Sequence, residues 1–221
     1  MMPPVSDERI TRGMERQLAD LRRKLDRDER PLGWKLGFGT EEAMKTLGTD
    51  APLVGHLVNA GRLESGAVVD ISKWDNPKLE PEVVARVGEK GEITAIGAAI
   101  ELADLDTKVR DPQEVLEANI FQRHVLLGPV TEDADPADAR LSVVVNGEEA
   151  ASAEDVTEAT GDLDGLVKHV AKTLKAAGAE LERGDMVICG SIVPALDVAP
   201  GDTVEVRLPP HGSLTVSFEG D

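Results

Sequence analysis

The sequence predicts an α+β protein dominated by mostly antiparallel strands, with one helix at the start of the chain and a longer helix before the last strands. Three observations predict this class. Apolar residues recur every three or four positions near the N-terminus, and they do so again over residues 163–177. Between and after these stretches, short apolar runs are separated by Gly, Pro, Asn and Asp, which is typical of strands joined by tight turns.

About the first 50 residues are expected to form a helical N-terminal segment that packs on the sheet. Residues 6–29 place apolar side chains at helical spacing, with Ser6 or Asp7 as the cap and Pro31 just beyond the end. A glycine-rich apolar stretch with the pattern of a strand follows at residues 31–39. A second, shorter helix is predicted over residues 40–47, because Thr40 can cap its start and Gly48 is a natural stop.

The middle of the chain is predicted to contain a hairpin or at least two adjacent strands. Residues 79–87 carry alternating apolar side chains, a turn-like sequence follows at residues 88–92, and a second apolar run comes after it. Asp111 and Pro112 then open a short helix that reaches about Ala118, since Pro suits the first position of a helix.

The last third has the clearest pattern. Residues 141–151 predict a strand and a turn, because Asn146-Gly147 is a strong signal for a hairpin. The amphipathic helix at residues 163–177 ends at Gly178, and three strands joined by Gly-Asp turns follow it. No boundary divides the chain convincingly, so one domain of residues 1–221 is expected.

The composition of the chain argues against two classes of binding partner, nucleic acids and membranes. Asp and Glu number 42 against 24 Lys and Arg, giving a formal charge of −18, which repels nucleic acid and anionic membranes. Five aromatic residues leave few platforms on which bases could stack. The single Cys189 excludes an internal disulfide, and the start of the chain lacks the pattern of a signal peptide. A cytoplasmic protein without nucleic-acid or membrane partners is therefore expected.

Common catalytic motifs are missing. The sequence contains no GxGxxG, no GxxxxGK followed by Ser or Thr, no HExxH and no GxSxG, which removes support for nucleotide-binding, zincin and nucleophile-elbow chemistry. The four histidines share no ligand-like spacing, which argues against a zinc site.

Three carboxylates in the middle of the chain are candidate metal ligands. Glu80 and Glu82 flank Pro81, and two-residue spacing on a strand points both side chains to one face. Glu101 interrupts an apolar run, where an exposed charge would be unexpected. Three carboxylates suit Mg²⁺ or Mn²⁺, which favour oxygen ligands. The alternative is a solvated strand, because a chain with 42 acids places such pairs together by chance.

Two further residues attract attention. Lys35 lies between Trp34 and Leu36 in a glycine-rich apolar stretch, either as a lysine whose stem covers the strand or as a cation that binds a carboxylate or polarises a carbonyl. Ser191 follows a strand in the small-residue run Cys-Gly-Ser, where a plain turn is the alternative to a site open to substrate.

These segments, in order, resemble the 2-keto-4-pentenoate hydratases and 4-oxalocrotonate decarboxylases of the fumarylacetoacetate hydrolase superfamily. The first two matching segments are GWKLG at residues 33–37, which is similar to G-x-K-I/L-G, and LGTDAPLVGHL at residues 47–57, which is similar to LGVDxPxxGxL. The middle pair is LEPEVVARV at residues 79–87 and AIELADLD at residues 99–106. The closing strands match through LKAAGAELERGDMVICGSI and VAPGDTVEVRLPPHGSLTVSF.

The resemblance implies a mixed, mostly antiparallel β-roll forming a single catalytic domain, and a metal-dependent hydratase acting on a 2-keto acid such as 2-keto-4-pentenoate. It implies that Glu80, Glu82 and Glu101 hold Mg²⁺ or Mn²⁺, which stabilises an enolate. It further implies that Lys35 is the active-site lysine, that Ser191 lies close to the substrate, and that the protein is a homo-oligomer. Leu53 stands where the family commonly has an acid, so the acid–base role falls to Asp50 or is absent.

Three other functions stay open. Decarboxylation of a 2-keto-3-enedioate of the 4-oxalocrotonate type uses the same enolate. Hydrolysis of a C–C bond needs a base to activate water, for which His124 is the local candidate, although a structural role is the one expected for this histidine. A non-catalytic relative would bind a keto acid or a partner subunit without turning it over.

Overall fold

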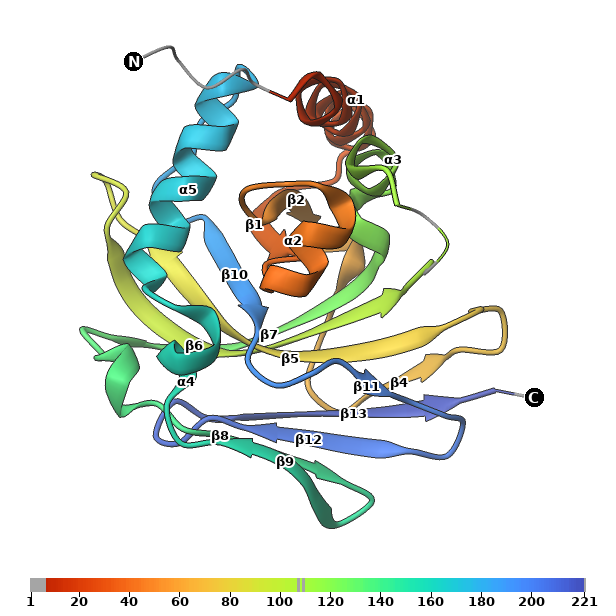
Figure 1. The fold of residues 1–221 in the computed structure, drawn as a ribbon. Helices are drawn as coiled ribbons and strands as arrows, with labels where there is room; N and C mark the ends of the chain where they lie inside the picture. Colours follow the sequence, from red (N-terminus) through yellow and green to blue (C-terminus); the bar gives the residue numbers. More distant parts are fainter. Residues whose placement is uncertain (1–6, 107, 109, 221) are drawn as a thin grey trace.

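The computed structural model describes residues 7–106, 108 and 110–220, which form two sheets and a group of helices (Figure 1). In this part of the chain the larger sheet has eight strands, in the order β2 (Leu53–Val58), β1 (Pro31–Gly37), β10 (Met186–Ser191), β5 (Pro77–Val87), β6 (Ile93–Asp104), β7 (Gln122–Glu132) and β3 (Arg62–Leu63), with β11 (Leu196–Asp197) paired to β5. The second sheet has the order β4 (Ala67–Asp70), β13 (Ser213–Glu219), β12 (Thr203–Arg207), β8 (Leu141–Val145) and β9 (Glu148–Ala153).

The helices α1 (Glu8–Leu25), α2 (Glu41–Leu47), α3 (Pro112–Glu117) and α5 (Leu163–Ala176) lie on the side of the larger sheet that faces away from the second sheet (Figure 1). The described residues also form the short helix α4 (Val156–Thr160), which contacts β10, and the 3₁₀ turns η1 (Asn59–Gly61), η2 (Asn119–Phe121) and η3 (Pro136–Asp138). The curled, mostly antiparallel sheet with an N-terminal helix and a longer helix before the last strands confirms the predicted fold class.

The helix ends follow the predicted capping residues. Asp7 caps α1 by accepting from the backbone N–H of Arg9, whereas Ser6, the alternative cap, lies outside the described residues. Thr40 caps α2, and Gly48 ends it in the left-handed conformation with φ 67°. Asp111 caps α3, with Pro112 at its first position.

The two predicted hairpins are present. β5 and β6 pair over their whole length, and β8 and β9 are joined by Asn146 and Gly147, both at positive φ. The sequence did not predict which segments far apart along the chain pair as neighbouring strands. β10 runs parallel to β1, β4 runs parallel to β13, and β3 runs parallel to β7.

The N-terminal segment contributes more than helices. Its strand β1 lies inside the larger sheet, between β2 and β10, while α1 packs on α3. Buried Met14, Leu18 and Leu21 form the apolar face of α1. The expectation of one catalytic domain over residues 1–221 stays a prediction.

The two faces of β5 differ, as strand alternation requires. Leu79 and Val83 join the main core, which also contains Val204 and Val216 of the second sheet. Val84 joins a smaller cluster on the opposite face. Glu80 and Glu82 share the face of Val84.

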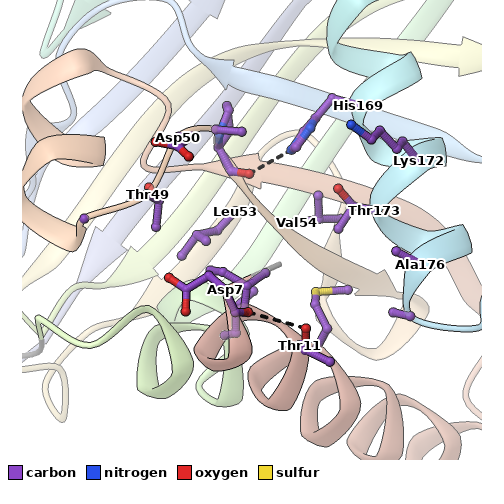
Figure 2. Close-up of a pocket in the computed structure, with 17 residues that line it drawn as sticks. Asp7, Thr11, Thr49, Asp50, Leu53, Val54, His169, Lys172, Thr173 and Ala176 are labelled. Carbon is purple, nitrogen blue, oxygen red and sulfur yellow. Dashed lines mark hydrogen bonds between the residues drawn. The ribbon is translucent and has the colours of Figure 1, made fainter. Parts of the chain in front are cut away.

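A cavity of about 340 Å³ lies between α1, α5 and the start of β2 (Figure 2). Its floor includes Met14 and Val54, and its polar residues include Asp50, His169 and Lys172. His169 bonds through Nε2 to the carbonyl of Pro52 at 2.9 Å, which ties α5 to the segment that leads into β2.

Candidate metal centre

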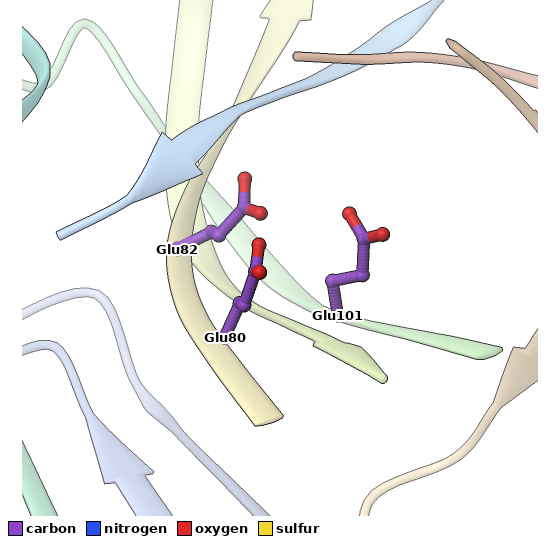
Figure 3. Close-up of side chains that lie close together, drawn as sticks. All are labelled: Glu80, Glu82 and Glu101. Carbon is purple, nitrogen blue, oxygen red and sulfur yellow. The ribbon is translucent and has the colours of Figure 1, made fainter. Parts of the chain in front are cut away.

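The three predicted carboxylates come together. Glu80 lies directly opposite Glu101 in the β5–β6 pair, and Glu82 lies two residues further along β5. One oxygen of each of the three lies within 4.8 Å of the other two. Figure 3 shows the three side chains pointing to the same side, two from β5 and one from β6. The sheet register therefore builds a cluster that the two-residue spacing had only indicated.

Burial makes this cluster electrostatically costly without a cation. Glu82 and Glu101 are almost fully buried, and Glu80 is half-buried. Burial raises the pKa of Glu82 well above its usual range, and the charges of Glu101 and Glu80 raise it further. Burial also raises the pKa of Glu101, to about 7, although the ammonium of Lys35 opposes this change.

Lys35 joins the cluster from a third strand. Its side chain is buried, and its ammonium forms an ion pair with Oε1 of Glu101. The alternative of a lysine whose charge reaches solvent is therefore wrong, because the amine stays inside the protein and neutralises a carboxylate.

The donors fit a divalent cation. With all four groups ionised, three carboxylates and one ammonium carry a net charge of −2, which a divalent ion would neutralise. Oε1 of Glu82 and Oε2 of Glu101 are buried and have no hydrogen-bond partner among the residues that the structure describes. Buried polar atoms are rarely left in this state, and oxygen donors are what hard divalent ions prefer.

β10 supplies a backbone donor to the same site. The N–H of Gly190 donates to Oε2 of Glu82 at 2.8 Å, and Oε1 has no hydrogen-bond partner in the described part of the chain. Gly190 has φ 97°, a conformation that other residues rarely adopt. The small residues of this segment are visible in the sequence, but the contact between Gly190 and Glu82 depends on the fold.

Ser191 lies beside the cluster, opposite Glu82 in the β10–β5 pair. Its hydroxyl donates to the carbonyl of Val193 at 2.6 Å. The structure therefore brings five of the six predicted site residues together, and a role for Ser191 toward substrate stays a prediction.

Asp50 is the predicted residue that the structure does not bring to the carboxylates. It is exposed, it lies in the segment between α2 and β2, and it lines the cavity of Figure 2. None of the other five predicted site residues lines that cavity. Its acid–base role stays a prediction.

His124 points away from the cluster. It pairs with Leu102, whereas Glu101 pairs with Val125, and neighbouring strand residues face opposite sides. Its ring stacks on Trp74 with centroids 6.0 Å apart. Burial lowers the pKa of His124. These contacts support the structural role expected for it.

Among the described residues, no helix is both long and apolar enough to cross a membrane.

Comparison with known proteins gives three kinds of match. The family described as "Fumarylacetoacetate (FAA) hydrolase C-terminal" matches residues 62–219. A 4-oxalocrotonate decarboxylase from Pseudomonas putida is 28% identical over 214 residues, covering 89% of this chain and 81% of that protein. A 2-keto-4-pentenoate hydratase from Paraburkholderia xenovorans (strain LB400) is 23% identical over 236 residues, covering 93% and 82%.

Solved structures share the fold. The 4-oxalocrotonate decarboxylase from Pseudomonas putida G7, complexed with magnesium and adipate, superposes with a TM-score of 0.83 at 23% identity, covering 93% of this chain and 84% of that chain. Fumarylpyruvate hydrolase from Pseudomonas aeruginosa, in complex with Mn²⁺ and pyruvate, gives a TM-score of 0.67 at 17% identity, covering 87% and 90%. Together with the family match over most of its length, these findings place the chain in the fumarylacetoacetate hydrolase family.

Proposed function

We propose that the protein is a divalent-metal-dependent lyase that converts a 2-keto acid through its enolate. The observation that carries this proposal is the buried cluster of Glu80, Glu82 and Glu101 with Lys35 at its side. A bound Mg²⁺ or Mn²⁺ would polarise the keto oxygen and stabilise negative charge that develops on it. Relatives named as enzymes of this kind support the proposal.

The residues of the chain have separate roles in this proposal. Glu80, Glu82 and Glu101 would hold the ion, and Gly190 fixes the orientation of Glu82. Lys35 places a positive charge in a buried site, where it favours an anionic substrate and an enolate over a neutral molecule.

Two reactions fit an enolate, and we favour decarboxylation of a 2-keto-3-enedioate. Adding water across a double bond needs a group that gives or takes a proton. Residue 53, where the family commonly has an acid, is a leucine and cannot do this. Leu53 lies on β2 opposite Gly37 of β1, is 3% exposed, and lines the same cavity as Asp50. The 4-oxalocrotonate decarboxylases among the relatives support this choice.

The hydration expected from the sequence is the second candidate. It is supported by relatives named hydratases, at 23% to 24% identity. In this reaction water adds to 2-hydroxypenta-2,4-dienoate, giving a 4-hydroxy-2-keto acid. The protein would then need an acid–base group other than residue 53.

One pair of assays separates these reactions. The purified protein is supplied with Mg²⁺ or Mn²⁺ and either the 2-keto-3-enedioate or 2-hydroxypenta-2,4-dienoate, and ultraviolet absorbance and CO₂ are followed. We expect metal-dependent CO₂ release that matches the loss of enedioate. Loss of the dienoate without CO₂ would identify a hydratase instead.

The matched controls are two Glu→Gln variants. Glu82→Gln removes a proposed ligand and should abolish metal-dependent turnover, whereas Glu89→Gln changes an exposed residue of a surface ion pair and should not. Failure of the wild type on both substrates would refute the proposal. Calorimetry of Mn²⁺ binding gives a further check, because equal affinity in wild type and Glu82→Gln would remove the metal site.

A further inference from the structure

The buried stem of Lys35 rests against a neighbouring strand at a position that has no side chain. Lys35 of β1 lies directly opposite Gly55 of β2. A Cβ atom added at Gly55 would lie 2.8 Å from Cγ and 3.0 Å from Cδ of Lys35. Non-bonded carbon atoms prefer separations of roughly 3.5–4.0 Å. The lysine stem therefore occupies the space that any side chain at residue 55 would need.

Asn119 closes the other side of this space. Its Oδ1 lies 3.0 Å from the position of the added Cβ at Gly55. The same Oδ1 accepts from the N–H of His56 at 2.9 Å, and Nδ2 donates to the carbonyl of His56 at 3.0 Å. Because β2 is the end strand of the larger sheet, this amide satisfies backbone groups that a further strand would bond. Asn119 thus holds β2 next to Gly55.

The turn that carries Asn119 is fixed by its surroundings. Asn119, Ile120 and Phe121 have φ values of 49°, 56° and 61°. Asparagine tolerates this left-handed region, but a β-branched residue such as isoleucine is a rare outlier there. Ile120 is buried, and a Cβ added at Gly37 would lie 2.7 Å from its Cγ2. Gly37 of β1, which has no side chain, therefore leaves room for this turn two residues along the strand from Lys35.

We propose that Gly55 and Asn119 are positioning residues for Lys35, and that together they fix the path of its stem so that its ammonium lies on Glu101. This inference rests on the proposed function, in which Lys35 serves the metal centre. A methyl group at residue 55 pushes the stem aside and separates the ammonium from Glu101. Loss of the Asn119 amide removes its two hydrogen bonds to the backbone of His56 on β2, and this weakens the contact between the Lys35 ammonium and Glu101.

The position of Lys35 is tested without any activity, by a double-mutant cycle in urea unfolding of the metal-free protein. Gly55→Ala should raise the unfolding equilibrium constant at least tenfold in the wild type. In Lys35→Ala its effect should be at least fivefold smaller, because alanine has no Cγ or Cδ to meet the new methyl group. It should also be smaller in Asn119→Ala, which removes the Oδ1 contact.

The matched control is Gly61→Ala, where the added Cβ meets its nearest atom at 3.4 Å. This variant should change the unfolding constant less than threefold in each background. If Lys35→Ala does not fold because Glu101 has lost its cation, the cycle is measured with Glu101→Gln present throughout. Equal effects of Gly55→Ala in all backgrounds would overturn the inference.

Kinetics distinguish positioning from a purely structural role. Gly55→Ala and Asn119→Ala should lower kcat at least tenfold while KM changes less than threefold, and Asn119→Asp, which keeps the acceptor for His56, should recover part of the loss. In Lys35→Met neither substitution should lower kcat further, and additive losses would contradict the proposal. A wild type without turnover would refute the proposed function alone, and the unfolding cycle would still decide the position of Lys35.

Discussion

Replacing Glu82 with glutamine should have opposite effects on stability with and without a divalent ion. Glutamine keeps an oxygen that accepts from Gly190, but it removes one buried charge from a cluster of three. At 4.8 Å, two ionised carboxylates repel each other by about 3 kcal/mol at an effective dielectric constant of about 20. The metal-free variant should therefore be more stable than the wild type at alkaline pH, by on the order of 3 kcal/mol.

The stability that metal-free Glu82→Gln gains over the wild type should increase as pH rises. The pKa of Glu82 in the folded protein is raised above its ordinary value, so the wild type is most stable where this group is protonated and loses stability as pH rises through the raised pKa. Glu82→Gln has no carboxyl group at this position, so its stability should not fall in this way as pH rises. The difference in free energy of unfolding should thus be small at pH 5 and grow toward pH 9.

With a bound divalent ion, the wild type should instead be more stable than Glu82→Gln. At a free Mn²⁺ concentration of about 1,000 times Kd, binding stabilises the folded wild type by about 4.1 kcal/mol, which exceeds the advantage of the metal-free variant, and the variant should lose most of this gain. Urea unfolding, followed by circular dichroism with chelator or with Mn²⁺, measures both cases. Glu89→Gln, an exposed control, should shift stability by less than about 1 kcal/mol in either condition. A Glu82→Gln variant that is destabilised in chelator at pH 9 would refute the electrostatic reasoning.

Three further predictions concern single residues. Lys35→Met should lower kcat by roughly 100-fold in the enedioate or dienoate assay, because it removes the buried cation of the site; a change below threefold would contradict this role. Burial lowers the pKa of His56 to about 4, and the charge of Lys24 contributes, so stability should be lost as pH falls from about 6.5 to about 4. The loss is on the order of 3 kcal/mol, and His56→Gln should remove this slope from the unfolding profile; an unchanged slope would assign it to other groups. Asp50→Asn should change kcat less than threefold, because Asp50 is exposed and lines a cavity that the three carboxylates do not line, whereas a fall of 100-fold would support its predicted acid–base role.

Local chemistry made several features of the fold predictable. The caps Asp7, Thr40 and Asp111 mark helix starts because their side chains accept from free backbone N–H groups nearby. Asn146-Gly147 forms a hairpin because both residues accept positive φ. Each of these signals acts over a few residues, so each is present in the sequence itself.

Part of the metal centre was predictable for the same reason. Strand periodicity alone places Glu80 and Glu82 on one face. The charge within an apolar run at Glu101 marked a third candidate, and the family resemblance joined the three to Lys35. The register that sets Glu80 opposite Glu101 came from the structure.

The sequence by itself thus determined the class of fold, the capped starts of three helices, the hairpins and the residue types of a metal centre in this protein. It did not determine where the first helix stops, because α1 ends at Leu25, four residues before the expected end. The tertiary structure decided which distant segments meet: β10 beside β1, Gly190 on Glu82, and Asn119 on the edge of β2. It also placed Asp50 at a cavity that the three carboxylates do not line. The physical reason is that these contacts join segments up to about 150 residues apart through backbone groups and glycines, which occur throughout the sequence. Only the packing of the whole chain selects which of them come into contact.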